Sequence, residues 1–391
     1  MLMGVVGGKL QGLEIVYLAK KAGHRILLMD RNPNVAAREL CDRFMEVDVA
    51  DVKKAASIME TCDLIFPAFE DLDGLITLNQ ICRKINKPFA FDLDAYRISS
   101  SKLDSDQLFA DFRMPQPKRW PDCQFPVVAK PSEGSGSKDI QVFNTLEDAN
   151  LFFSSRFPPK HWVVQEYIEG PLYSIEVIGK PGCYLPLQIT RIWLDEFYDC
   201  KRVTAPATLS NKLKRQFNTL AIDLATAIQL KGIMDVEVIS HNGQLKLLEI
   251  DARFPSQTPI AVFWSSGLNM VDILAKLFFH EERNIMVEPT THRHVSLEHI
   301  SVSGDMLCVR GEHIMGNGGG LCLKKNSWGS DEALTNFEEN QNSWVATLII
   351  TGETEDIVSR NRAGIINTIQ EQTGITTVSD LFPPKLNEPM P

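Results

Sequence analysis

The stretch GIMDVEVISHNGQLKLLEIDARFPSQTP, residues 232–259, decides the fold of this chain. Apolar and charged residues alternate on both sides of His241-Asn242-Gly243, a pattern typical of two antiparallel strands joined by a tight turn. Because side chains alternate between the two faces of a strand, one face of this hairpin is apolar and must be buried. The other face carries carboxylates, so the sequence predicts a packed hairpin with one acidic side.

The length of the turn decides which acids share that side. A two-residue turn would place Glu249 on the face opposite to Glu237, whereas a three-residue turn, with Gly243 left-handed, pairs Asp235 with Glu249. We expect the three-residue turn, because it gathers the acids on one face. These acids are Asp235, Glu237, Glu249 and Asp251. The buried face is then expected to consist of Val236, Val238, Leu248 and Ile250.

Carboxylates crowded on one face repel one another unless a cation lies among them. Since all the ligand atoms here are oxygens, Mg²⁺ or Mn²⁺ is favoured, as a bridge between the protein and phosphate groups. A solvated acidic surface is the alternative, but the opposite face must be buried and Arg253 continues the acidic row. The predicted metal ligands are Glu237, Glu249 and Asp251.

The segment VVAKPSEGSGSKDI, residues 127–140, reads as a strand, a loop of glycines and serines, and a second strand. It lacks the spacing GxxxxGK[ST] and precedes no helix, which excludes a Walker-type loop. We interpret it as a flap that closes over phosphates, with a plain linker as the alternative. Lys130 before the flap and Lys102 at a helix start upstream are predicted to contact the same phosphates. The flap residues expected there are Ser135, Gly136 and Ser137.

A third segment, WVVQEYIEG at residues 162–170, is an apolar strand that runs into a turn. A strand that becomes a connector between two lobes exposes its own amide and carbonyl groups. Those groups can bind the edge of an adenine base, while a carboxylate accepts from its amino group. The predicted contacts are Glu166, Tyr167, Ile168 and Glu169.

Residues 1–95 alternate strand-like and helix-like segments, including an expected helix at 35–42, which predicts a parallel sheet with helical crossovers. The motif GGKLQG, residues 7–12, follows the first strand and Asp30 ends the second, as in a dinucleotide site. Lys9 replaces the middle glycine, which argues against a full site of that kind. An anion bound by the amides at the helix start and a tight turn without a ligand remain as alternatives.

The totals limit the class of protein. A chain of 391 residues predicts two to four domains. A formal charge of −10 and a pI of about 5.4 argue against general binding to nucleic acid or to anionic membranes. Eight scattered cysteines without a CxxC pair, and no long apolar run, predict a reduced, cytoplasmic protein. The sequence leaves the oligomeric state open, with a homodimer as one alternative.

Taken together, residues 1–280 resemble the ATP-grasp family in the order of these segments. The resemblance implies an α/β protein with the ATP-grasp fold, an N-terminal Rossmann-like (preATP-grasp) domain and a C-terminal mixed α/β lobe. The boundaries that we expect are 1–95 for the first domain, 96–288 for the ATP-grasp domain with two lobes split near 170, and 289–391 for a β-rich lobe with a disordered tail. The implied cofactors are ATP and Mg²⁺ or Mn²⁺.

The same resemblance implies roles for the candidate residues. Lys102 and Lys130 would contact the phosphates of the nucleotide under the flap, and the connector from Glu166 through Ile168 would contact adenine. The acids of the hairpin would hold the metal. Arg253 would be the catalytic residue that steadies an acyl phosphate and the tetrahedral intermediate.

A narrower resemblance, to the ligases of pyrrolysine biosynthesis, rests on several segments. They are VVGGKLQGLEIVYLAKKAG (5–23), ISSSKLDS (98–105), YDCKRVT (198–204), GIMDVEVI (232–239), LEIDARFPSQTP (248–259) and WVATLIITGET (344–354). It implies that ATP drives the joining of the carboxylate of 3-methyl-D-ornithine to the ε-amine of L-lysine, through an acyl phosphate, with ADP and phosphate as products. The alternatives are another carboxylate–amine ligase, a carboxylase of the same fold, or a nucleotide sensor without turnover.

Substrates with two positive charges, such as 3-methyl-D-ornithine or D-ornithine and L-lysine, need carboxylates in their pocket. The candidates for the ornithine side are Ser174, Glu176, Asp199, Asp235 and Ser256. The candidates for the incoming lysine are Leu10, Gln11, Glu70 and Asp71. For the two acids of that second group, charge balance at a helix N-terminus is an equal alternative. A further nucleotide-like pocket is expected at Lys9, Asp30, Asp48 and Val49.

Overall fold

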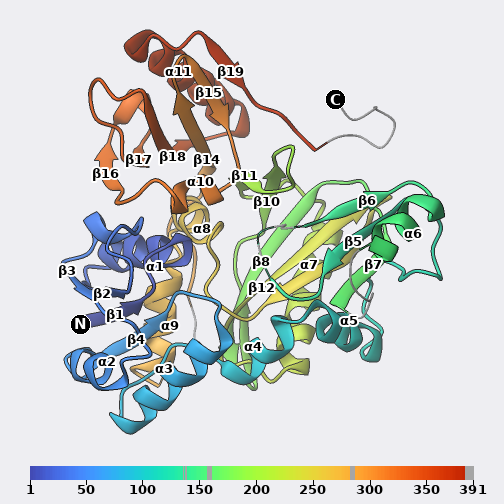
Figure 1. Cartoon of the computed structure of the whole chain (residues 1–391), viewed down its shortest axis with the longest axis horizontal. Helices are drawn as coiled ribbons and strands as arrows, with labels where there is room; N and C mark the ends of the chain where they lie inside the picture. The colour runs from blue at the N-terminus through green and yellow to red at the C-terminus, as the bar shows by residue number, and fades with distance from the viewer. Residues whose placement is uncertain (135, 137–138, 156–160, 282–286, 384–391) are drawn as a thin grey trace.

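The N-terminal part forms a parallel sheet flanked by helices, in the lower left of Figure 1. The structure is a computed structural model that describes the whole chain except residues 135, 137–138, 156–160, 282–286 and 384–391. The sheet has the order β3-β2-β1-β4 and all its pairs are parallel. Its elements are β1 (Leu2–Val6), α1 (Leu10–Lys21), β2 (Arg25–Asp30), β3 (Arg43–Glu46), α2 (Val52–Met59), β4 (Leu64–Pro67) and α3 (Leu72–Lys84). The predicted alternation of strands and helices is therefore confirmed except between β2 and β3.

The prediction of a helix at 35–42 is wrong, because only the short 3₁₀ turn η1 (Arg38–Leu40) forms there. Tertiary hydrogen bonds occupy the backbone groups of the segment. The amide of Ala37 donates to the carbonyl of Gly8 at 2.9 Å, and the carbonyl of Ala36 accepts from Leu321 at 2.9 Å. Packing against two distant segments therefore overrides the local preference for a helix.

The glycines of the GGKLQG motif have steric reasons to be there. A Cβ on Gly8 would lie 2.4 Å from a methyl carbon of Val35, and a Cβ on Gly12 would lie 2.2 Å from the carbonyl oxygen of Gly7. Gly7 itself has a φ of +102°, in the region that favours glycine. The close approach of α1 to the end of β1 is enough to explain the motif without a bound ligand.

The central part consists of a small antiparallel sheet and the larger sheet that faces it (Figure 1). The small sheet has the order β6-β5-β7 and is built from β5 (Val127–Pro131), β6 (Gln141–Phe143) and β7 (Trp162–Glu166), next to α6 (Leu146–Ser155). Two short helices, α4 (Leu93–Ser99) and α5 (Lys102–Asp111), lead into it. Ser101 caps α5 by accepting from the amide of Asp104 at 3.2 Å, which places Lys102 at the helix start as predicted.

The larger sheet runs in the order β13-β12-β8-β10-β11-β14-β18-β17-β16 and crosses the boundary that we expected near residue 289. Its elements in the central part are β8 (Leu172–Lys180), β9 (Cys183–Pro186), β10 (Thr190–Leu194), β11 (Cys200–Ala205), α7 (Asn211–Ala227), β12 (Gly232–His241), β13 (Gln244–Asp251), α8 (Pro259–Ser266) and α9 (Met270–Phe278). Pairing of β11 with β14, in which Arg202 lies opposite Glu298, joins this part to the C-terminal lobe.

The C-terminal lobe lies above the N-terminal domain in Figure 1. It contains β14 (His294–Ser303), β15 (Met306–Val309), α10 (His313–Gly316), β16 (Cys322–Lys325), η3 (Ser327–Gly329), β17 (Glu332–Thr335), β18 (Ser343–Gly352), α11 (Glu355–Thr373) and β19 (Thr377–Ser379). Its own core includes Trp328 stacked on Trp344 with ring centroids 5.1 Å apart. Helix α1 connects it to the first domain, since Tyr17 donates to Glu332 at 2.6 Å.

The hairpin of β12 and β13 differs from the expected register, although its acids do share a face. The turn has two residues, with positive φ at Asn242 (51°) and Gly243 (73°), so the three-residue turn is wrong. A β-bulge after Glu237 brings the acids back to one face despite the shorter turn. Glu237 pairs with Glu249, while the next residue of β12 pairs with Leu247. The extra residue, Leu248, lies on the acidic side, so Leu247 is the residue buried in its place.

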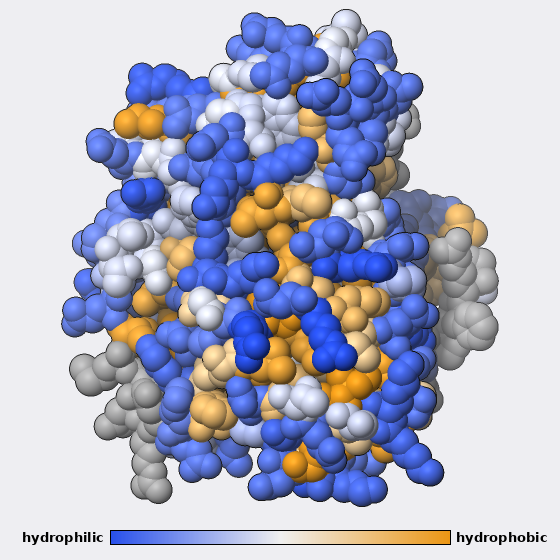
Figure 2. Space-filling model, turned by 90° about the vertical axis from the view of Figure 1, so that its left-hand side faces the viewer, coloured by the Kyte–Doolittle hydropathy of each residue, from blue (hydrophilic) through white to orange (hydrophobic). Residues whose placement is uncertain are grey.

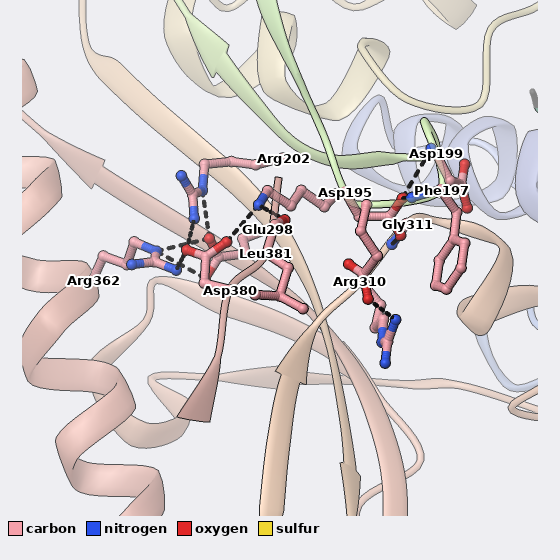
Figure 3. Close-up of polar contacts among 12 residues, drawn as sticks. Asp195, Phe197, Asp199, Arg202, Glu298, Arg310, Gly311, Arg362, Asp380 and Leu381 are labelled. Atoms are coloured by element: carbon pink, nitrogen blue, oxygen red, sulfur yellow. Dashed lines mark hydrogen bonds and ion pairs between the residues drawn. The ribbon is translucent and has the colours of Figure 1, made fainter. Parts of the chain in front are cut away.

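The end of the chain is held by a cluster of charges between β11, β14 and α11 (Figure 3). The carboxylate of Asp380 contacts Lys201 at 2.6 Å and both Arg202 and Arg362 at 2.8 Å. The Lys201 side chain is fully buried, and it also donates to the carbonyl of Leu381. Charged groups this well paired offset the cost of their burial and fix the segment that follows β19.

Two further expectations concern membrane-spanning helices and the cysteines. Among the described residues no single helix is long and apolar enough to span a membrane, while α8 and α9 pass that test only as a pair bent by 100°. All eight cysteines are free. Figure 2 shows hydrophobic side chains gathered in the middle of the face that carries the N-terminal domain and the C-terminal lobe. A homodimer stays a prediction.

Two glycine substitutions test the packing of α1. Gly12→Ala is expected to lower the free energy of unfolding by about 1–3 kcal/mol, because the new methyl group meets the Gly7 carbonyl. Gly364→Ala in the exposed part of α11 is the matched control and is expected to raise it by about 0.5–1 kcal/mol, since nothing lies within 4 Å of the added Cβ. Denaturant unfolding measures both free energies. Equal effects of the two substitutions would contradict the steric reason given for glycine at position 12.

Candidate active site

A cavity of about 670 Å³ lies between the small sheet and the large sheet. One wall comes from β5, the flap and the connector after β7, and the floor comes from β8, β12 and β13. The segment 255–258 before α8 and the loop between β10 and β11 close one side, and Pro383 from the clamped C-terminal segment reaches it as well. Elements far apart in the sequence therefore meet at one cavity.

The acids predicted from the hairpin face this cavity. Asp235 lies opposite Asp251, and Glu237 lies opposite Glu249, in adjacent cross-strand pairs. Like charges placed opposite one another destabilise a sheet unless something offsets them. The repulsion among these four carboxylates therefore destabilises the site unless cations lie close to them.

Two lysines and an arginine supply positive charge. Lys102 lies 2.8 Å from Glu249, and it also donates to the carbonyl of Gly134 in the flap at 2.8 Å. Lys130 is buried and donates to the carbonyl of Leu248 at 3.2 Å, so the bulge residue also positions a lysine. Arg253 lies 2.7 Å from Asp251. The structure thus brings both predicted phosphate-binding lysines to the predicted metal acids.

The pKa values show that burial and the neighbouring charges act against each other in this cluster. Burial raises the pKa values of Glu237 and Asp251 to about 7, and the neighbouring Glu249 adds to the rise. Burial also acts to raise the pKa of Glu249, but Lys102 and Lys130 outweigh it and hold that pKa below its ordinary value. Burial lowers the pKa of Lys130. Removal of charge from water therefore outweighs even the ion pair of Asp251 with Arg253, and among these three acids only Glu249, beside two lysines, keeps a lowered pKa.

The donor set fits a hard divalent cation. Glu237, Glu249 and Asp251 all face one cavity and offer only oxygen atoms, the ligands that Mg²⁺ and Mn²⁺ prefer. Two of these carboxyls have pKa values raised to about 7, which a cation placed among them would reverse. The metal assignment itself stays a prediction.

Arg253 links the N-terminal domain to the cavity. Its Nε lies 3.1 Å from the carboxylate of Glu70 in an ion pair without hydrogen-bond geometry, and Gln11 donates to the same carboxylate at 2.9 Å. Of the residues predicted for the incoming lysine, Glu70 therefore contacts the predicted catalytic arginine and Gln11 contacts Glu70. Asp71 instead caps α3 by accepting from Gly74 at 2.7 Å, which is the helix N-terminal role weighed against a substrate role.

The connector and the described part of the flap line the cavity. Glu166 through Glu169 line the cavity, although the Glu166 carboxylate is engaged by Lys246 and by the amide of Lys118. Gly136 lines it too, so close to the ring of His313 that a Cβ there would lie 2.3 Å away. Ser135 and Ser137 lie outside the described residues.

The residues predicted for the ornithine side divide into two groups. Ser174, Asp199, Asp235 and Ser256 line the cavity. Glu176 is fully buried beside it and accepts from the hydroxyl of Thr258. Burial raises the pKa of Glu176 to about 7.

The residues predicted for a further nucleotide pocket do not line this cavity. Asp30 accepts from the amide of Gly8 at 2.8 Å and thereby occupies one of the amides expected to bind an anion. Asp48 is exposed, 3.9 Å from Arg31, and Val49 packs against the core of the first domain. Lys9 is exposed and Leu10 begins α1. That pocket stays a prediction.

Sequence reasoning missed several residues that the fold brings to the site. Leu248 was assigned to the buried face, because a bulge leaves no mark in an alternating pattern. Gln257 and Thr258 belong to the motif quoted at the outset, yet only their position beside the cavity reveals a role. Glu312 contacts Ser256 at 3.0 Å from a separate lobe, and nothing in its local sequence indicates this.

Comparison with known proteins agrees with this geometry. A family model for the ATP-grasp domain matches residues 99–257. The chain is 36% identical over 316 residues to the 3-methyl-D-ornithine–L-lysine ligase of Methanosarcina mazei. The aligned region covers 80% of this chain and 82% of the relative. It is 33% identical to the ligase of the same name from Methanosarcina acetivorans, over 93% of this chain and 96% of the relative.

A solved structure shows the same fold at low identity. The ADP complex of an N5-carboxyaminoimidazole ribonucleotide synthetase matches with a TM-score of 0.70 at 14% identity, over 95% of this chain and 97% of the other. Fold and cavity together define the ATP-grasp class, whose members bind ATP or ADP with Mg²⁺. The chain belongs to the family of 3-methyl-D-ornithine–L-lysine ligases, and it is an ATP-dependent carboxylate–amine ligase.

The buried carboxyl of Glu176 predicts a pH dependence of stability. Since its pKa is about 7 in the folded protein and near 4.5 in the unfolded chain, the folded state binds more protons between these values, so stability falls as the pH rises from about 4.5 through 7 and then levels off. Glu176→Gln removes this loss. The variant is expected to gain stability relative to the parent between pH 5 and pH 8.5, by up to roughly 3 kcal/mol. Denaturant unfolding across that range checks it, and a difference that does not change with pH would disprove the cause.

Glu249→Gln tests the acid cluster. The amide keeps the size of the side chain but removes the charge that pairs with Lys102 and that a cation requires. We expect kcat to fall by at least about 100-fold while circular dichroism and thermal unfolding stay close to those of the parent. Glu339→Gln, an exposed acid outside the site, is the control and should keep full activity. Near-normal turnover of the first variant would refute its role.

Proposed function

We propose that this protein joins the carboxylate of 3-methyl-D-ornithine to the side-chain amine of L-lysine in pyrrolysine biosynthesis, with ATP split to ADP and phosphate. The observation that carries the proposal is the meeting of the hairpin acids, two lysines and Arg253 in one cavity. Curated relatives of that name, similar over most of the chain, support the choice of substrates.

In the first step, the carboxylate of the ornithine-type substrate attacks the γ-phosphate of ATP to give an acyl phosphate. Lys102 and Lys130 would bind the phosphate oxygens, which requires Lys102 to exchange its contact with Glu249 for one with phosphate. A bound Mg²⁺ or Mn²⁺, held by Glu237, Glu249 and Asp251, would neutralise charge on the transferring phosphoryl group. Lys102 would thus pass from Glu249 to phosphate, and Glu249 would pass from Lys102 to the metal ion.

In the second step, the ε-amine of L-lysine, after losing one proton to solvent, attacks the activated carbonyl. The bond from that carbon to the phosphate oxygen then breaks, and phosphate leaves with the second proton from nitrogen as the amide forms. Arg253 would stabilise the oxyanion that develops there, since its guanidinium is buried at the cavity and always charged. Glu70 and Gln11 would hold that guanidinium and receive the incoming lysine from the side of the N-terminal domain. A closed flap over the phosphates would exclude the water that hydrolyses an acyl phosphate.

Charge complementarity supports substrates with two amino groups. Carboxylates surround the cavity in excess of the lysines and the arginine that neutralise them, and those at its side and floor include Asp199 and Asp235. A neutral amino acid would leave such groups desolvated without a partner, at a cost of a few kcal/mol. The proposal also includes three expectations from the sequence. They are the adenine contacts at the connector, the domain boundaries and a homodimer.

A direct assay tests the function. The purified protein is incubated with ATP, MgCl₂, D-ornithine and L-lysine, and products are followed by coupled ADP detection and mass spectrometry. We expect ADP together with a compound that has the mass of the condensed pair. Release of ADP that ignores both amino acids would contradict the proposal, and release that depends on bicarbonate would indicate a carboxylase instead.

A further inference from the structure

The segment that follows β19 runs from the C-terminal lobe to β10 and β11 and reaches the cavity. Figure 1 shows it leaving the lobe as an extended stretch. The carboxylate of Asp380 lies in the cluster of charges drawn in Figure 3, and Pro383 shortly after it lines the cavity. We call residues 380–383 the strap. A short run of chain thus joins a cluster of ion pairs to the site.

A β-bulge between β10 and β11 shapes the place where the strap docks. The register of the two strands shifts between Trp193 and Leu194, which leaves Lys201 as the extra residue of β11. In a regular strand, Lys201 and Arg202 would point to opposite faces. A bulge changes the direction of the side chains around it, and here both residues reach the carboxylate of Asp380, at 2.6 and 2.8 Å.

The strap supplies partners for the ammonium group of Lys201, whose side chain is 0% exposed. That group contacts the carboxylate of Asp380, donates to the carbonyl of Leu381 and lies 3.4 Å from the centroid of the Phe382 ring. The same ring meets Trp193 edge-on, with the two centroids 6.4 Å apart. Because burial of an ammonium group costs free energy unless partners compensate, these contacts stabilise the docked strap.

Without Asp380, this cluster would carry an excess of positive charge. Lys201 and Arg202 come from β11, and Arg362 comes from α11. Glu298 on β14 is fully buried and pairs with both arginines. If Asp380 were removed, these three cations would face that one carboxylate, and cations so close to one another repel. The folded elements therefore form a receptor for an anionic side chain, which determines where the strap lies.

The strap also packs behind one wall of the cavity. Ile192 and Leu194 on β10 line the cavity, and Trp193 between them contacts Phe382 of the strap. Since Ile192 and Trp193 point to opposite faces of β10, the strap contacts the back of this wall. Pro383 then lines the cavity itself, and its ring restricts the backbone there.

We propose that the strap closes one side of the cavity during the reaction and that Asp380 is the positioning residue that keeps it there. The proposal rests on the function proposed above, because an acyl phosphate must be protected from water until the amine attacks it. When the strap is displaced, a water oxygen bonds to the acyl carbon and the bond from that carbon to the phosphate oxygen breaks. The free amino acid, phosphate and ADP are then released without condensed product.

Asp380→Asn tests the positioning role. The amide keeps the shape of the side chain but removes the charge that three cations require. We expect the ratio of ADP to condensed product to rise at least about twofold above that of the parent, because water then competes with the amine. This ratio does not depend on how much of the protein is folded, so a loss of stability alone leaves it unchanged. An unchanged ratio would overturn the inference.

Two truncated chains form a matched pair and cover the case in which Asp380→Asn does not fold. A chain that ends at Ser379 lacks the strap, whereas a chain that ends at Pro383 keeps it. The first is expected to show the raised ratio of ADP to product, and the second to show the ratio of the full chain. Equal ratios in all three chains, or an equal rise in both truncated chains, would contradict the role of the strap.

Labelling of lysines with acetic anhydride, followed by mass spectrometry, tests the docking of the strap without turnover. In the full chain, Lys201 is expected to react far more slowly than the exposed Lys212. Loss of the strap or of the Asp380 charge should speed the labelling of Lys201 about 10- to 100-fold and leave Lys212 unchanged. Unchanged protection of Lys201 would contradict the docking. A parent that makes no condensed product would contradict the proposed function, while this labelling would still decide the docking.

Discussion

Four carboxylates held on one face of a single hairpin are the constraint around which the site is built. Their repulsion is offset by cations that come from three places in the chain: Lys102 at the start of a helix, Lys130 on the small sheet, and Arg253 just after the hairpin. Because each cation belongs to a different element, the acids draw those elements together. The same cations are the groups that phosphate and a developing oxyanion require.

The large sheet is the second constraint, because it continues from the hairpin into the C-terminal lobe without a break. That continuity brings Glu312 to the segment before α8, and it brings Asp380 to the cations on β11 and α11. The C-terminal lobe therefore supports the side of the cavity that residues 255–258 form, and Pro383 beyond β19 lines the cavity itself. The N-terminal domain reaches the same cavity through Glu70 and Arg253, so all three parts of the chain contribute.

Local patterns predicted most of the elements, and they failed where distant contacts competed. The helix expected at 35–42 is absent because Gly8 and Leu321 take its backbone hydrogen bonds. The hairpin reached the predicted arrangement of acids by another route, a two-residue turn with a bulge at Leu248. A bulge inserts one residue without a compositional signal, so alternation alone could not distinguish the two registers.

The sequence by itself determined the acidic hairpin, the flap, the connector and the family, because each depends on residue types at short spacing. Only the tertiary structure decided which of these groups meet. Contacts such as Lys102 with Glu249, or Ser256 with Glu312, join residues far apart in the chain, and their energy depends on burial and on the charges around them. Burial is a property of the folded chain, so neither the raised pKa of Glu176 nor the free oxygen of Glu312 was visible before the fold.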